Sequence, residues 1–178
     1  LLEKSGNKII STTGIARFRK HFERLVRLLN ISQAEGDAAW KGARRKLDLS
    51  EPPENGLGYG GSGRSGNSRP EDIRETILRT CKEIITLGAN DPEMICLMGF
   101  FEEDVGPDTI SDLTTTAIMD DLAEITENFC KANNIPLFEF SICENHKLPK
   151  FISPKGKAVP IILVPQDIVR DLPIANDW

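Results

Sequence analysis

Residues 108–142 read DTISDLTTTAIMDDLAEITENFCKANNIPLFEFSI, and the spacing of apolar residues changes once along this stretch. From Asp108 to about Asn133, apolar residues recur at helical spacing, which predicts the longest helix of the chain. From Leu137 to Ile142, apolar and polar residues alternate, which predicts a strand. A long helix followed by a strand indicates an α+β fold, in which a mainly helical domain is closed by a small C-terminal antiparallel sheet.

The rest of the predicted sheet lies further along the chain. Val159–Val164 is a continuous apolar run bounded by prolines, which is typical of a buried strand. We expect it to pair with the strand at 137–142 through a turn at residues 154–157, with Lys150–Ile152 between them. A short helix is predicted to follow at Gln166–Leu172.

Four helices are predicted upstream, over residues 15–29, 33–47, 69–88 and 91–101, of which the first is amphipathic and basic and the last is short and apolar. Thr12 or Thr13 is the expected N-cap of the first, and Ser68 with Glu71 forms a capping box at the third. These elements divide the chain into a basic helical preface at 1–49, a glycine-rich loop at 50–68, and a helical body with the small sheet at 69–178.

Charge is distributed unevenly along the chain. The 178 residues carry a formal net charge of −5, which argues against a general nucleic-acid binder. However, residues 1–70 carry a net charge of +6 and residues 71–178 a net charge of −11. This asymmetry indicates a basic surface for a polyanion or an acidic partner; alternatively, the two halves pair with one another.

The candidates for nucleic-acid binding are arginines of the preface and the loop: Arg17, Arg24, Arg27, Arg44, Arg45 and Arg64. Those at positions 17, 24 and 27 lie on the polar side of the first predicted helix, whose apolar side carries Phe18 and Phe22. An ordinary solvated helix face without a ligand is the alternative interpretation.

The glycine-rich loop also has two interpretations. Six glycines from Gly56 to Gly66 leave backbone amides accessible, and with Ser62, Ser65 and Arg64 they could wrap an anion. The loop matches neither the Walker pattern nor the dinucleotide-binding fingerprint. A flexible Gly/Ser-rich linker is the alternative.

An acidic segment before the long helix is the strongest candidate for a site. Gly106-Pro107 interrupts any preceding helix, so Asp108 and Asp112 are expected one turn apart on one helix face, with Asp104 nearby. Three carboxylates there predict a site for Mg²⁺ or Mn²⁺, which take oxygen ligands. Alternatively, Asp108 caps the helix and Asp112 interacts with its dipole.

A metal-dependent nuclease is the enzyme hypothesis. Asp108 and a later Glu139 partly match a Pro-Asp…Glu-x-Lys nuclease pattern, so Asp108, Asp112 and Glu139 are the candidate catalytic residues. The match is incomplete, because no lysine lies two residues after Glu139. A non-catalytic module that binds protein or nucleic acid is the alternative, so the sequence leaves open whether the chain is an enzyme.

The cysteines lack C-x-x-C spacing and lie among apolar neighbours, which predicts buried reduced thiols at Cys81, Cys96, Cys130 and Cys143. The two histidines, His21 and His146, are far apart in sequence, and His146 is expected to be a solvated loop residue. No apolar run approaches the roughly 20 residues of a membrane span, so a cytoplasmic protein without a membrane partner is expected. The start at Leu1 rather than Met suggests a piece of a longer protein, with a further domain or subunit as partner.

The chain contains Leu57-Gly58-Tyr59 with its glycine loop, the segment GPDTISDLTT at 106–115, Leu163-Val164-Pro165, and RDLP at 170–173. Together, these motifs resemble an uncharacterised bacterial family associated with phage-defence and mobile-element gene clusters. The resemblance covers most of residues 37–178 and assigns no catalytic residue. It implies a role in sensing or cutting foreign nucleic acid, as part of a larger protein or complex.

Overall fold

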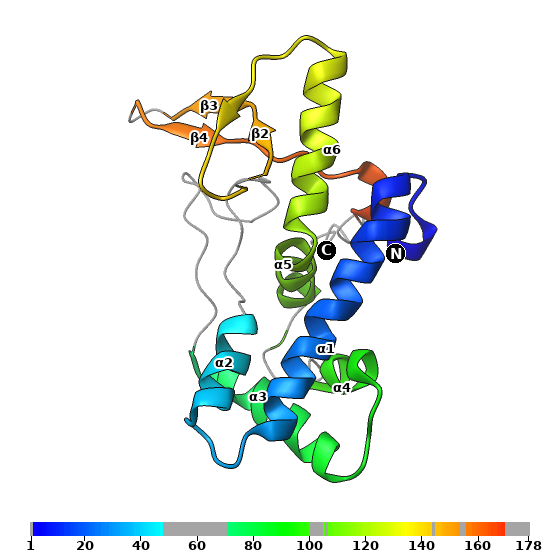
Figure 1. Cartoon of the computed structure of the whole chain (residues 1–178), viewed down its shortest axis with the longest axis vertical. Helices are drawn as coiled ribbons and strands as arrows, with labels where there is room; N and C mark the ends of the chain where they lie inside the picture. Colours follow the sequence, from blue (N-terminus) through cyan, green and yellow to red (C-terminus); the bar gives the residue numbers. More distant parts are fainter. Residues whose placement is uncertain are drawn as a thin grey trace, which may run out of the picture. The chain divides into compact units, whose positions relative to one another are not determined.

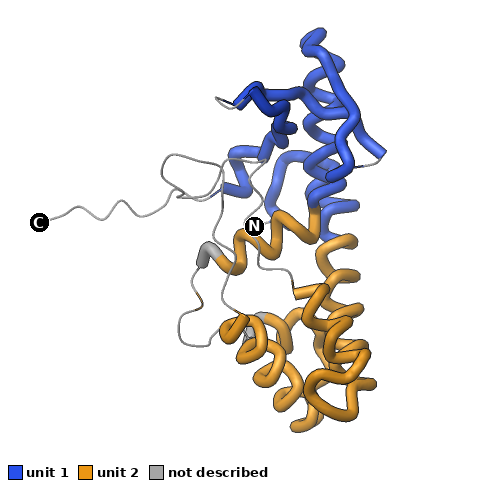
Figure 2. The backbone as a smooth tube through the Cα atoms, turned by 90° about the vertical axis from the view of Figure 1, so that its left-hand side faces the viewer, with its two compact units in different colours: residues 1–15, 119–178 blue, residues 16–118 orange. Residues whose placement is uncertain are grey.

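The computed structural model describes residues 2–47, 71–99, 105, 107–143, 145–153 and 156–169. The chain divides into two compact units (Figure 2). We call residues 16–118 the helical unit, and residues 1–15 with 119–178 the mixed unit. The architecture is mainly helical with two small antiparallel strand pairs near the C-terminus, which confirms the predicted α+β class.

The helical unit packs its helices around one apolar core (Figure 1). These helices are α1 (Ile15–Ile31), whose first residue belongs to the mixed unit, α2 (Ala38–Lys46), α3 (Glu71–Thr86), α4 (Pro92–Gly99) and α5 (Pro107–Ala117). Every one of them contributes to the core, with Leu25, Trp40, Leu78, Ile95 and Leu113 as examples from successive helices. The apolar stripes identified in the sequence are therefore the buried faces.

The helix starts are set by polar side chains that accept backbone hydrogen bonds. The expected cap at Thr12 or Thr13 is wrong, because both hydroxyls instead donate to backbone oxygens one turn earlier. Asn7 Oδ1 accepts from the amides of Ile9 and Ile10, at 3.0 and 3.4 Å. The chain is thus already helical before α1, through the π-helical segment η2 (Ile10–Gly14).

The second helix starts later than the sequence predicted. Asp37 Oδ1 accepts from the Trp40 amide at 2.7 Å, and Asp37 Oδ2 accepts from the Gln33 amide at 2.8 Å. These hydrogen bonds lower the pKa of Asp37 to about 2. Gly36 precedes this cap with a φ of 80°, so residues before Asp37 form a turn rather than a helix.

The predicted helices at 69–88 and 91–101 are confirmed as α3 and α4 in their described residues. Gly88, with a φ of 96°, follows α3, and its amide donates to Ile85 O. Asp91 Oδ1 accepts from the Met94 amide at 3.0 Å at the start of α4. Glycine and aspartate therefore mark these boundaries as the sequence indicated.

The expected single helix from 108 to 133 is wrong, because it is interrupted at Ile118. It is divided into α5 and α6 (Met119–Ala132), which belong to different units. Three consecutive threonines precede the interruption, and the Thr114 hydroxyl donates to Ile110 O at 2.7 Å. β-Branched side chains disfavour a helix, and a side-chain hydrogen bond to a backbone oxygen one turn earlier bends it. The spacing of apolar residues reveals neither effect.

The predicted strand pairing is correct only where Lys150–Ile152 lies beside the start of the 159–164 run, and it is wrong for the strand at 137–142. β1 (Phe138–Glu139) pairs with β2 (Lys147–Leu148), and β3 (Lys150–Ile152) pairs separately with β4 (Ala158–Pro160), both antiparallel. Beyond β4, the Ile161 amide still donates to Pro149 O at 3.0 Å, but Pro149 has no amide to return a hydrogen bond, so the β3–β4 ladder ends there. The 159–164 run therefore continues as irregular backbone, and the helix expected after it is the short 3₁₀ turn η3 (Gln166–Ile168) among described residues.

The mixed unit has its own core around α6. Buried apolar residues come from η2, α6, β2 and the segment after β4: Ile10, Leu122, Ala123, Cys130, Leu148 and Ile162. Thr126 is fully buried, and its hydroxyl donates to Leu122 O and accepts from the Leu163 amide at 2.9 Å. This hydroxyl connects α6 to the segment after β4.

Near the N-terminus, Asp167 connects η3 to the start of the chain. Its Oδ2 accepts from the Gly6 amide at 2.6 Å, and the Ser5 hydroxyl lies 3.1 Å from both carboxylate oxygens. The first residues and the last described helical turn are therefore held together within the mixed unit.

Candidate nucleic-acid interface

The exposed face of α1 carries a row of basic side chains, which we call the basic row: Arg17, Lys20, Arg24 and Arg27. Their spacing of three, four and three residues places them on one side of the helix, opposite Phe22, Leu25 and Leu29 in the core. At about 1.5 Å of rise per residue, the row extends about 15 Å along the helix. Arg17, Arg24 and Arg27, predicted from the sequence, thus lie together.

Other arginines of the helical unit form ion pairs with acidic side chains. Arg19 Nε lies 2.7 Å from Glu93 Oε1, and Arg79 Nη2 lies 3.0 Å from Glu35 Oε2. By contrast, Lys20, Arg24 and Arg27 form no ion pair with any residue that the structure describes. Among the described residues, these three cations therefore have no acidic side chain in an ion pair with them.

Arg44 differs from the other predicted arginines, because its guanidinium is directed toward α3. Its Nη2 pairs with Glu71, and its Nε lies 3.2 Å from Glu75 Oε1. Glu75 also accepts a hydrogen bond of 2.8 Å from Trp40 Nε1. Arg44 thus connects α2 to α3, whereas the following residues, Arg45 and Lys46, are exposed.

The end of α2 lies close to the basic row. A Cβ added to Gly42 would lie 3.3 Å from Leu28 Cδ2, so glycine allows close approach of α2 to α1. The backbone of Lys46, the last residue of α2, forms a hydrogen bond with the imidazole of His21 on α1. Arg24 lies one turn after His21, and we call His21, Arg24 and Lys46 the α1–α2 joint.

The predicted metal ligands are only partly described. Positions 108 and 112 lie one turn apart in α5, as the sequence predicted, and Asp112 is half-buried. Asp104 and the Asp108 side chain lie outside the described residues, as do the glycine-rich loop and Arg64. Among the side chains that are described, no three His, Cys, Asp or Glu residues gather in a metal-binding group.

Glu139, the third predicted catalytic residue, lies on β1 in the mixed unit. Its side chain is 83% exposed, and Oε1 lies 3.2 Å from Lys147 Nζ across the β1–β2 pair. An exposed cross-strand ion pair of this kind accounts for Glu139 without a metal.

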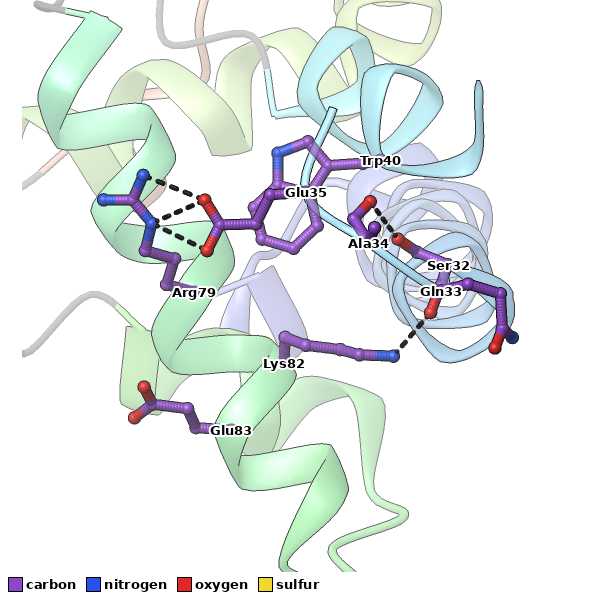
Figure 3. Close-up of a pocket in the computed structure, with 8 residues that line it drawn as sticks. All are labelled: Ser32, Gln33, Ala34, Glu35, Trp40, Arg79, Lys82 and Glu83. Carbon is purple, nitrogen blue, oxygen red and sulfur yellow. Dashed lines mark hydrogen bonds and ion pairs between the residues drawn. The ribbon is translucent and has the colours of Figure 1, made fainter. Parts of the chain in front are cut away.

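A small pocket in the helical unit contains both acidic and basic groups (Figure 3). Its volume is about 240 Å³, and it is lined by Ser32, Gln33, Ala34, Glu35, Trp40, Arg79, Lys82 and Glu83. Lys82 Nζ donates to Leu29 O and Ser32 O at 2.8 and 2.9 Å, and Arg79 pairs with Glu35. These contacts connect α3 to the C-terminal end of α1, so the principal cations of the pocket already have partners.

The four cysteines are free and buried, as the sequence predicted. Cys81 Sγ lies 3.6 Å from Ile95 O, and Cys96 is in contact with Cys81. The hydrogen bond with Cys81, together with burial, raises the pKa of the Cys96 thiol. A thiol with a raised pKa is a poor nucleophile, so this pair has the properties of a core contact.

His146 is not the solvated loop residue that the sequence suggested. Its Nδ1 lies 3.0 Å from Glu127 Oε2, and the two side chains are only 20% and 14% exposed. Glu127 Oε1 also lies 3.1 Å from Lys131 Nζ, and its carboxylate accepts from the Lys147 backbone. Sequence analysis missed this cluster because the two residues lie 19 positions apart, on α6 and beside β2.

The Glu127 cluster predicts a loss of stability in acid. The hydrogen bond with His146, followed by those with Lys131 and the Lys147 backbone, lowers the pKa of Glu127. A lowered folded-state pKa contributes stability above the unfolded value, near 4.5, and this contribution is lost as the pH falls further. We therefore expect Glu127→Gln to melt at a lower temperature than wild type at neutral pH, with the difference shrinking below about pH 4.5.

Thermal unfolding followed by circular dichroism across this pH range measures the effect. Glu124→Gln, the same substitution on the same helix, is the matched control and should follow the wild-type curve. A constant difference between Glu127→Gln and wild type at all pH values would contradict the assigned role of Glu127.

Comparison with protein families places the chain in one of them. A family model described as "Domain of unknown function (DUF8370)" matches residues 1–176, so the chain belongs to this family. No curated protein and no solved structure matches the chain. In the described part of the chain, no helix has the length and apolar character needed to cross a membrane.

Proposed function

We propose that this member of the DUF8370 family is a nucleic-acid-binding component of a larger bacterial protein or complex. The phosphate backbone would contact the basic row of α1 together with the exposed Arg45 and Lys46 of α2. The observation that carries the proposal is that Lys20, Arg24 and Arg27 lie exposed on one helix face without ion-pair partners among the described residues.

The side chains of the basic row suit backbone contacts rather than base recognition. Lysine and arginine bind phosphate oxygens, and these contacts supply most of the affinity in sequence-independent binding. Four cations over about 15 Å can meet several phosphates, since duplex DNA carries one charge per about 1.7 Å of axis. The overall negative charge of the chain restricts binding to this local surface.

The biological setting is part of the proposal. The resemblance of the 106–115 motif and its companion motifs supports a role in a cytoplasmic defence or mobile-element system. Cleavage of the bound strand with Mg²⁺ or Mn²⁺ is a second candidate function, which the one-turn spacing of positions 108 and 112 in α5 supports.

Fluorescence anisotropy with short labelled single-stranded and duplex DNA and RNA tests the proposed function. We expect binding in the presence of EDTA that weakens by orders of magnitude between about 50 and about 200 mM salt. Poly-glutamate serves as a competitor without phosphates, and it should displace the nucleic acid only weakly. Equal competition by poly-glutamate, or no nucleic-acid binding at low salt, would contradict the proposal.

The same samples incubated with Mn²⁺ test the second candidate. Cleavage that is lost in an Asp108→Ala, Asp112→Ala variant would identify an enzyme. If the strands remain intact after incubation with the wild type, cleavage is contradicted and binding is the only function proposed.

A further inference from the structure

The α1–α2 joint brings cations from two helices to one imidazole. Lys46 approaches His21 from the end of α2, and Arg24 approaches it from the next turn of α1. These are the charged groups that act on His21 among the described residues, and both are positive. An anion bound to this pair would therefore also interact favourably with a protonated His21.

His21 itself is packed in a way that lowers its pKa in the free protein. Its Nε2 is buried without a hydrogen-bond partner in the described residues, and its ring meets Phe22 edge-on at 5.9 Å between centroids. Burial lowers the pKa of His21, the Lys46 charge lowers it further, and Arg24 adds to this effect. A hydrogen bond between the imidazole and the Lys46 backbone raises the pKa and partly opposes these effects.

We propose that a phosphate group of the bound nucleic acid lies over the α1–α2 joint, on Arg24 and Lys46, and that its binding is linked to proton uptake by His21. This inference rests on the proposed function and specifies one contact within it. The phosphate would reach the exposed ammonium and guanidinium groups, while the half-buried imidazole would respond to its charge through space.

The sign of the linkage follows from the charges. Arg24 and Lys46 lower the pKa of His21 in the free protein, and a phosphate between them would offset both effects. The pKa of His21 should therefore be higher in the complex than in the free protein. Affinity should increase as the pH falls from about 8 to about 6, by no more than about tenfold per pH unit for one proton.

The chain has only two histidines, so their imidazole signals can be followed individually by NMR. We would titrate the wild type with pH, alone and with saturating duplex DNA, and assign the signals with His21→Gln and His146→Gln. The expected result is a DNA-dependent increase in the His21 pKa and no comparable change at His146. In the Lys46→Gln variant, the pKa of His21 in the free protein should be higher than in wild type. The increase in this pKa on DNA binding should be smaller than in wild type.

Anisotropy at several pH values gives the second measurement. His21→Gln should lose the dependence of binding on pH between 8 and 6, whereas His146→Gln should keep it. Binding with an unchanged His21 pKa, or full pH dependence in His21→Gln, would overturn this inference while the proposed function stands. Absence of binding at every pH would contradict both this inference and the proposed function.

Discussion

Replacing Lys20, Arg24 and Arg27 together by glutamate is expected to weaken nucleic-acid binding on the order of 100-fold at about 150 mM salt. Each lost phosphate contact removes the favourable release of counterions, and each new carboxylate repels the backbone. These side chains are exposed and lie opposite the buried face of α1, so the substitutions should leave the fold intact. Circular dichroism of the variant checks this last point.

A matched control distinguishes the effect of the basic row on affinity from the effect of net charge. Lys4, Lys8 and Lys157 are exposed residues of the mixed unit, and their replacement by glutamate gives the same change in net charge. We expect this control to lose only a small part of the affinity, because none of these lysines belongs to the basic row and exposed charges without a direct contact are screened by salt. Equal losses in both variants would show that net charge, and not the basic row, determines binding.

Leu78→Ala is expected to destabilise the helical unit by about 2–5 kcal/mol, the usual range for emptying a packed leucine site. Leu78 lies in α3 with no exposed surface, in the core that also contains Leu25 and Leu29 of α1. Loss of this packing removes the surface against which α1 is fixed. The control is Leu87→Ala, the same substitution at a side chain that is 87% exposed, which should change stability by less than about 0.5 kcal/mol.

Tryptophan fluorescence in urea can isolate this effect. The chain has two tryptophans, so a Trp178→Phe background leaves Trp40 as the single emitter. Trp40 is only 3% exposed in the core of the helical unit and therefore reports unfolding of that unit. Similar midpoints for Leu78→Ala and Leu87→Ala would contradict the assigned core.

The sequence predicted the helices best where caps and apolar spacing agreed. At α3 and α4, the glycine at position 88 and the aspartate at position 91 set boundaries that are local in sequence. The interruption at Ile118 was missed because the apolar residues on both sides of the three threonines keep the same helical spacing. The β1–β2 pair was missed because composition does not show which strands meet in the folded chain. The apolar run at 159–164 looks continuous by composition, but Pro149 on the partner strand has no amide to extend the ladder along it.

The candidate sites also differ in whether they depend on local sequence or on tertiary packing. The basic row could be predicted, because residues three and four apart on one helix share a face whatever the rest of the fold does. The role of Arg44 could not, since its partners Glu71 and Glu75 lie on another helix. The pairing of His146 with Glu127 and the approach of Lys46 to His21 also arise only from tertiary packing.

The most direct test of nucleic-acid binding through the basic row is the salt dependence of affinity for duplex DNA. The logarithm of the association constant falls linearly with the logarithm of salt concentration, and the steepness of this fall decreases by about 0.9 for each phosphate contact removed. If Lys20, Arg24 and Arg27 each contact one phosphate, the slope of the triple glutamate variant should be shallower than that of wild type by about 2.7. Identical slopes for the two proteins would show that these residues do not contact the nucleic acid.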